Sequence, residues 1–190
     1  VNIGGSTTEV AVISMDGVVA SRTARTGGMA LDEAIIRYIR NEKGLVIGQR
    51  TAEDLKIDIG SAKEAGFTEA EDVLLRGRDV RTGKPATISI SQRDVHKAIL
   101  PPLQTLLENI REAFENTPPE LAADILERGI YLSGGGARLE GLRERLSEML
   151  GMPVHMGESP EDDVAAGAGA AAADERLASR LAQSGCLIEL

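Results

Sequence analysis

The strongest pattern in the sequence is a long amphipathic stretch in its second half. Apolar residues recur there at the three- and four-residue spacing of an α-helix: Val95, Ile99, Leu103, Leu106, Ile110 and Ala113. Pro101 and Pro102 fall inside this stretch, and we expect them to bend the helix. A helix with one apolar face is stable only when that face packs on another layer of structure. The chain must therefore build a layered fold around this helix.

The other segments of the chain alternate between strand and helix patterns. Thr8–Ser14 and Val18–Arg25 contain many β-branched residues and predict two neighbouring strands. Leu31–Ile39 has the helical period, and Gly44 ends that helix. Gly129–Ser133 predicts a buried strand that comes just before another helix. This alternation predicts a layered α/β fold.

Two parts of the chain stand apart from this core. Residues 47–90 lie between two core helices and combine a short helix with two strands, which predicts a small inserted α+β subdomain. We assign residues 1–46 and 91–175 to a discontinuous core subdomain. Residues 176–190 form a C-terminal tail in which the pattern favours a loosely held helix.

Composition excludes several classes of function. The chain has 30 acidic and 21 basic residues, a net charge of −9 and 2% aromatic residues, which argues against nucleic-acid binding. No run approaches the ~18 apolar residues that a membrane-spanning helix needs. The single cysteine, Cys186, excludes an internal disulfide and favours a reducing, cytoplasmic compartment. His96 and His155 lack Cys or His neighbours at metal-binding spacing, so we predict no metal site, and no nucleophile motif points to a catalytic residue.

A first glycine-rich segment, Gly4-Gly5-Ser6-Thr7-Thr8, lies between two predicted strands. Glycines allow the backbone to approach a ligand closely, and successive amides and hydroxyls can hold an anion such as phosphate. An ordinary glycine-rich turn explains the same residues, so the motif alone leaves both interpretations open.

A second glycine-rich segment, Gly134-Gly135-Gly136-Ala137, follows a predicted strand and precedes a helix. Backbone amides often face a bound ligand in this context. A tight connection would need only one glycine, whereas three indicate that something flat or bulky passes close to the backbone. A purely structural connection remains the alternative.

Glu53 and Lys56 are three residues apart on one face of a predicted helix. Taken alone, this spacing predicts a solvated ion pair worth a few tenths of a kcal/mol.

Taken in order, these segments resemble the actin-like ATPases, and among them the MreB family of bacterial actins. The resemblance extends over about Val1 to Ala173 without a break. It rests on the following blocks: Val1–Val10, Gly27-Gly28 with Leu31–Ile35, Ile47–Lys56, Arg76–Asp79, Thr117–Ala122 and Arg128–Ala137.

The resemblance implies an actin-like, ribonuclease-H-like core subdomain with a small inserted subdomain, and it implies binding of ATP with Mg²⁺. It also implies self-association into filaments, work with cell-wall synthesis and membrane shape proteins, and membrane contact only through an N-terminal half. It assigns three groups of residues to the nucleotide: Gly4, Gly5, Ser6 and Thr7 to the β and γ phosphates; Glu53, Asp54, Leu55 and Lys56 to the ribose or adenine; and Gly134, Gly135, Gly136 and Ala137 to the adenosine.

The chain departs from the family pattern at three positions. Asn2 stands where the family has an aspartate that organises magnesium, Met29 also replaces an aspartate, and Ser6 replaces a glycine. The sequence begins at Val1 inside a predicted strand, so we expect an N-terminal half to be missing. A truncated or degenerate paralogue that acts as an interaction module without ATP turnover is therefore the alternative, and ATPase activity stays open. A chaperone ATPase or a sugar kinase of the same superfamily is a third possibility.

Overall fold

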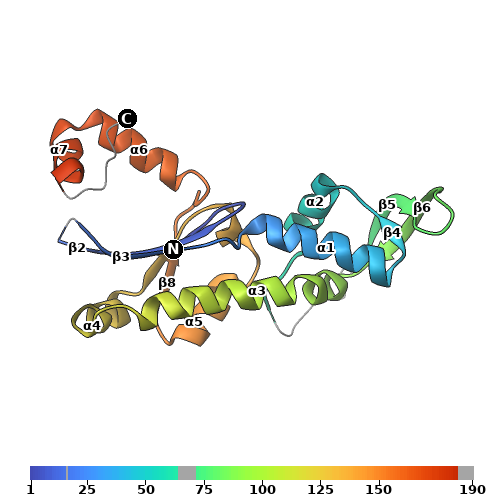
Figure 1. Cartoon of the computed structure of the whole chain (residues 1–190), viewed down its shortest axis with the longest axis horizontal. Helices are drawn as coiled ribbons and strands as arrows, with labels where there is room; N and C mark the ends of the chain where they lie inside the picture. Colours follow the sequence, from blue (N-terminus) through green and yellow to red (C-terminus); the bar gives the residue numbers. More distant parts are fainter. Residues whose placement is uncertain (16, 64–71, 184–190) are drawn as a thin grey trace.

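The computed structural model describes residues 1–15, 17–63 and 72–183. Over these residues the molecule is elongated, with a core sheet toward one end, a small sheet at the other and two long helices running between them (Figure 1). The predicted alternation of strands and helices is confirmed, and the fold is mixed α/β.

The core sheet combines strands from both ends of the sequence. Among the described residues its strands are β3 (Gly17–Ala24), β2 (Thr8–Ser14), β1 (Asn2–Ile3), β7 (Ile130–Leu132) and β8 (Val154–Met156). The first three are antiparallel neighbours, and β7 pairs with β8 in parallel. A parallel bridge between Asn2 and Ser133 joins the two groups, and the Ile3 amide donates to the Ser133 carbonyl at 2.8 Å. Strand β1 therefore lies at the centre of the order β3-β2-β1-β7-β8.

Helix α3 (Gln92–Glu115) packs against α1 (Gly28–Glu42) and against β2 and β3. All six apolar residues of the predicted stripe are buried on it, which confirms that pattern. The helix begins with a capping box in which the Ser91 and Asp94 side chains each accept from the other residue's backbone amide. It continues as one helix through Pro101 and Pro102, and the predicted bend stays a prediction.

The C-terminal part of the core contains shorter helices. Helix α4 (Pro119–Arg128) leads into β7, and a short 3-10 helix η1 (Gly135–Arg138) follows that strand. Helix α5 (Leu142–Leu150) begins after Gly141, which has a left-handed φ of 73°, and it buries Leu142 and Leu146.

The small subdomain consists of an antiparallel sheet with one helix beside it. Its strands are β4 (Leu45–Val46), β5 (Val73–Asp79) and β6 (Pro85–Ile90), in the order β4-β5-β6. Helix α2 (Gln49–Ile59) packs against α1 and α3. Contact between α1 and α2 therefore connects the small subdomain with the core.

Helices α6 (Asp163–Ala173) and α7 (Glu175–Gln183) lie on the opposite side of the core sheet from α3 (Figure 1). No residue of α6 is buried, although the helix consists mainly of alanine and glycine. Over the described ranges, no helix combines the length and the apolar character needed to cross a membrane. Cys186 lies outside the described residues.

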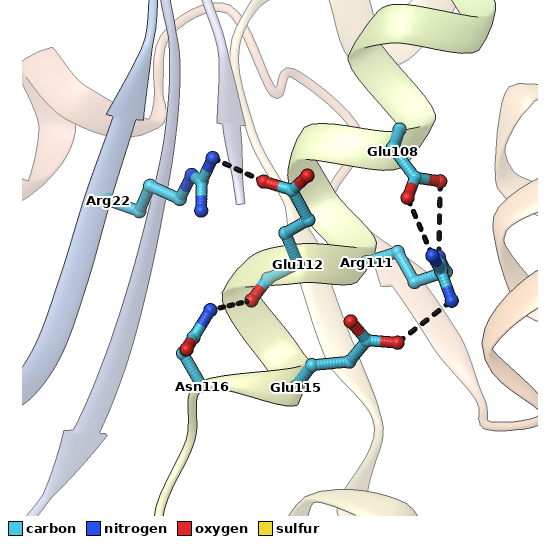
Figure 2. Close-up of polar contacts among 6 residues, drawn as sticks. All are labelled: Arg22, Glu108, Arg111, Glu112, Glu115 and Asn116. Carbon is cyan, nitrogen blue, oxygen red and sulfur yellow. Dashed lines mark hydrogen bonds and ion pairs between the residues drawn. The ribbon is translucent and has the colours of Figure 1, made fainter.

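A set of ion pairs lies along the C-terminal half of α3 (Figure 2). Arg22 on β3 pairs with Glu112, and Arg111 pairs with Glu108 at 2.6 Å and with Glu115 at 2.8 Å. These side chains are 41–57% exposed, so water screens the charges and each pair contributes little to stability. The Arg22–Glu112 pair connects β3 with α3 but adds little to the stability of the core.

Candidate nucleotide site

The Gly4–Thr7 turn comes directly after the central strand β1 and is held from two sides. Within the turn, the Gly4 amide donates to the Thr7 carbonyl at 2.9 Å. From the start of α1, the Gly28 amide donates to the Gly4 carbonyl at 3.0 Å, and the Met29 amide donates to the Gly5 carbonyl at 2.8 Å. The turn is thus built against the N-terminal end of α1, while Gly5 and Ser6 remain exposed.

The glycines of this region serve different purposes. A Cβ at Gly27 would lie 2.5 Å from the Gly4 carbonyl oxygen, so the contact between the two segments requires a glycine there. A Cβ at Gly5 would meet only the Met29 Cγ atom, at 4.0 Å. Packing therefore does not require a glycine at residue 5, and its absent side chain leaves backbone open to an approaching group.

The Gly134–Ala137 turn shows the same division of roles. Gly134 has a left-handed φ of 82°, and a Cβ there would lie 2.4 Å from the Ile3 carbonyl oxygen. A Cβ at Gly136 would lie 2.3 Å from the Ile3 Cγ2 atom, whereas a Cβ at Gly135 would meet nothing within 4 Å. Two of the three glycines are required by packing on Ile3, and Gly135 faces open space.

The two glycine turns meet at β1. Ile3 is buried, precedes the first turn directly and packs beneath the second. The Asn2 Oδ1 atom lies 2.6 Å from the Cβ position of Gly134, so this side chain is directed at the second turn. The structure therefore places side by side two segments that lie far apart in the sequence.

The four residues predicted on α2 do not face one common surface. Glu53 and Asp54 are exposed, Leu55 is buried in the core, and Lys56 is largely buried. The residue pattern predicted a solvated Glu53–Lys56 pair, and the structure instead gives Lys56 the carboxylate of Asp32 on α1 at 2.7 Å. The exposed fraction is 15% for the Lys56 side chain and 3% for the Asp32 side chain.

Asp32 is the buried charged residue beside the candidate site that the sequence interpretation missed. It falls three residues before Ile35 and seven before Ile39, in line with the buried face of α1. An acidic residue in an apolar stripe signals a buried partner, because an unpaired buried charge is strongly destabilising. That signal was available in the sequence, but the identity of the partner was not.

A second polar cluster lies at the N-terminal end of α3, close to the end of α1. Asp94 accepts hydrogen bonds from Tyr38 and Ser91 and pairs with Lys43 at 3.0 Å. Burial alone would raise the pKa of Asp94, but the hydrogen bonds from Lys43, Ser91 and Tyr38 lower it to about 2. Burial and the bond to Asp94 raise the pKa of Tyr38 to about 12. Both groups keep one charge state over the physiological range, which fits a structural role.

The described residues contain no group of three or more His, Cys, Asp or Glu side chains that could hold a metal ion.

Comparison with known proteins agrees with this geometry. The core sheet order, the inserted subdomain and the two glycine turns define an actin-like ATPase fold. A family model described as MreB/Mbl protein matches residues 1–180. The chain belongs to the MreB/Mbl family, which confirms the resemblance seen in the sequence.

Relatives in this family cover most of the chain. The chain is 42% identical over 171 residues to the cell shape-determining protein Mbl of Bacillus subtilis, and 45% identical over 171 residues to MreB of Escherichia coli. These matches cover 89% and 90% of this chain but 50% and 49% of the two relatives. The chain thus spans about half the length of the curated relatives it matches.

Solved structures support the same fold. MreB 5 of Spiroplasma citri bound to AMPPNP matches with a TM-score of 0.85 at 32% identity, over 97% of this chain and 54% of that one. The MamK double helical filament matches with a TM-score of 0.66 at 23% identity, over 85% of this chain and 50% of that one, and supports the fold alone.

Proposed function

We propose that this chain is the nucleotide-binding second half of a cell-shape-determining actin that binds ATP and assembles into filaments. The observation that carries the proposal is the meeting of the two glycine turns at Ile3, each with one glycine that packing does not require. Two structures of S. citri MreB5, one with AMPPNP and one with ADP, support a nucleotide as the ligand.

The proposal assigns a role to each group of site residues. Gly4, Gly5, Ser6 and Thr7 would hold the β and γ phosphates, because successive amides and hydroxyls favour an anion. Gly134, Gly135, Gly136 and Ala137 would lie against the adenosine. Of the α2 residues Glu53, Asp54, Leu55 and Lys56, the exposed Glu53 and Asp54 would approach the ribose or adenine from the small subdomain. Leu55 would support them from the core, and Lys56 would reach the ligand only after leaving Asp32. Mg²⁺ would enter with the phosphates of the nucleotide.

We propose that the chain is divided into a core subdomain, a small subdomain and a tail. Residues 1–46 and 91–175 would form the core subdomain, residues 47–90 the small subdomain and residues 176–190 the tail. A nucleotide at the two turns would contact both subdomains, because α2 belongs to the small one and both turns belong to the core. Closing such parts around a ligand is a common way to couple binding to conformation.

At the level of the cell, we propose that the filaments lie in the cytoplasm at the membrane and organise cell-wall synthesis, with wall-synthesis and membrane shape proteins as partners. Membrane contact would come from an N-terminal half. The cell shape-determining function of the Mbl and MreB relatives supports this part of the proposal.

A light-scattering assay of the full-length natural protein with ATP and Mg²⁺ tests assembly. The proposal predicts that scattering rises only when nucleotide is present. Equal scattering with and without ATP would contradict it.

The alternative is an interaction module that does not turn over ATP. Asn2 favours this reading, because an amide beside the Gly134 turn cannot supply the negative charge that a carboxylate offers to a magnesium ion. Phosphate release by the full-length protein separates the two functions. Nucleotide binding without release would favour the alternative, and the Asn2→Asp variant would then be expected to gain turnover.

A further inference from the structure

The buried Asp32–Lys56 pair has a third partner that connects it to the first glycine turn. Lys56 Nζ lies 2.7 Å from Asp32 Oδ1 and also donates to the Gly28 carbonyl at 3.3 Å. Gln49 Nε2 donates to the second Asp32 oxygen at 3.3 Å. Two side chains of α2 thus hold one carboxylate of α1, and one of them also holds the backbone at the start of α1.

The backbone at the start of α1 in turn holds the Gly4–Thr7 turn. The amides of Gly28 and Met29 donate to the carbonyls of Gly4 and Gly5 at 3.0 and 2.8 Å. A continuous series of contacts therefore runs from α2, through Lys56 and Gly28, to the turn.

We propose that Asp32 and Lys56 form a latch through which the position of α2 sets the conformation of the Gly4–Thr7 turn. Both are positioning residues: in this state Lys56 is engaged by Asp32 and Gly28 and has no free charge to offer a ligand. Contact of Lys56 with a nucleotide would require this pair to break. A shift of the small subdomain would move Lys56 and so alter the hydrogen bonds that hold the turn at Gly28 and Met29. A ligand that moved the turn would act on α2 through the same bonds.

This inference deepens the proposed function, because it rests on the turn being the place where phosphate binds. The connection itself exists without any ligand, so it can be tested on the unliganded chain. The most direct observable is hydrogen exchange of the Gly28 and Met29 amides, since these two bonds carry the connection.

The first test compares Lys56→Met, Asp32→Asn and Lys56→Arg with the unchanged chain by NMR-detected hydrogen exchange. Amides of the buried part of α3 report global stability. We expect Lys56→Met and Asp32→Asn to speed exchange at Gly28 and Met29 roughly tenfold more than they speed exchange in α3. Lys56→Arg keeps the positive charge, so it should keep most of the protection at Gly28 and Met29. Glu33→Gln is the matched control, because Glu33 follows Asp32 on α1 but is exposed. Its side chain is 60% exposed and that of its partner Arg37 is 65% exposed. This variant should leave exchange at Gly28 and Met29 unchanged.

The double variant Asp32→Asn/Lys56→Met separates positioning from stability. Removing both charges avoids an unpaired buried ion, so protection of α3 should recover. Exchange at Gly28 and Met29 should stay fast, because the bond from Lys56 to the Gly28 carbonyl is still absent. Two results would overturn the latch. One is that the single variants speed exchange equally in α3 and at Gly28 and Met29. The other is that the double variant recovers slow exchange at Gly28 and Met29 as well as in α3.

An ATP titration of the same variants keeps the two proposals distinguishable. If the latch acts on the phosphate turn, Lys56→Met should reduce the response of the Gly4–Thr7 amides to ATP severalfold, and Glu33→Gln should not. A turn that responds equally in both variants would contradict the coupling to ligand. If the unchanged chain shows no response to ATP, the proposed function fails, while the exchange data still decide whether the latch exists.

Discussion

At the scale of single residues, two of the three glycines of the second turn, Gly134 and Gly135, should respond differently to alanine substitution. Gly134 is fixed by its left-handed φ and by the Ile3 carbonyl, so Gly134→Ala should lower the free energy of unfolding by about 1–3 kcal/mol. Gly135 meets nothing within 4 Å, so Gly135→Ala should leave stability almost unchanged. Urea unfolding of the two variants measures the difference.

The same pair of variants tests the ligand assigned to the turn. A methyl group at residue 135 projects into the space where the adenosine is proposed to lie. Gly135→Ala should therefore weaken ATP binding while the fold stays intact, as measured by titration calorimetry. Unchanged affinity in a stable Gly135→Ala protein would remove this turn from the nucleotide site.

The core also makes a residue-scale prediction. Leu103 is fully buried in the middle of α3, and Leu126 on α4 is 53% exposed. Leu103→Ala should cost about 2–5 kcal/mol of stability through lost burial and a residual cavity. Leu126→Ala, the matched control, should change the midpoint of urea unfolding little; comparable losses in both variants would contradict the assignment of the core.

At the scale of elements, Asp94 ties the start of α3 to the end of α1 through Tyr38 and Lys43. Its pKa of about 2 in the folded protein lies below the ordinary value of 3.8. A carboxylate with a lowered pKa stabilises the fold above the ordinary value and loses that contribution as the pH falls toward the folded-state pKa. We therefore expect this part of the stability to be complete at neutral pH and to decline from about pH 4 to pH 2.

The Asp94→Asn variant checks this account. It keeps the size of the side chain but cannot pair with Lys43, so its unfolding free energy at pH 7 should be lower than that of the unchanged chain. Below pH 3 the two proteins should converge. A constant difference between them from pH 7 to pH 2 would show that the charge of Asp94 is not responsible.

How much the sequence could predict depended on whether the signal was local. The buried face of α3 can be predicted because six apolar residues repeat one spacing. The two glycine turns can be located because each lies between predicted elements. The two-residue strand β4 carries no period, and it pairs with β5 only after the chain has folded. The Asp32–Lys56 pair joins two helices and therefore had no local pattern that named both partners.

At the scale of the whole molecule, the described chain carries one side of the proposed nucleotide site. The two turns and α2 lie on this half, and the chain spans about half the length of its curated relatives. A site that closes two large domains over a ligand loses much of its contact surface when one of them is absent. We therefore expect this chain alone to bind ATP weakly, with a dissociation constant above about 1 μM.

The measurement that tests the central claim most directly is an NMR titration of the 190-residue chain with ATP and Mg²⁺. The account predicts weak, saturable shifts of the amides in Gly4–Thr7 and Gly134–Ala137, with smaller changes on α2 and none on the distant β5–β6 turn. Shifts that avoid both glycine turns, or sub-micromolar binding by this chain alone, would contradict it.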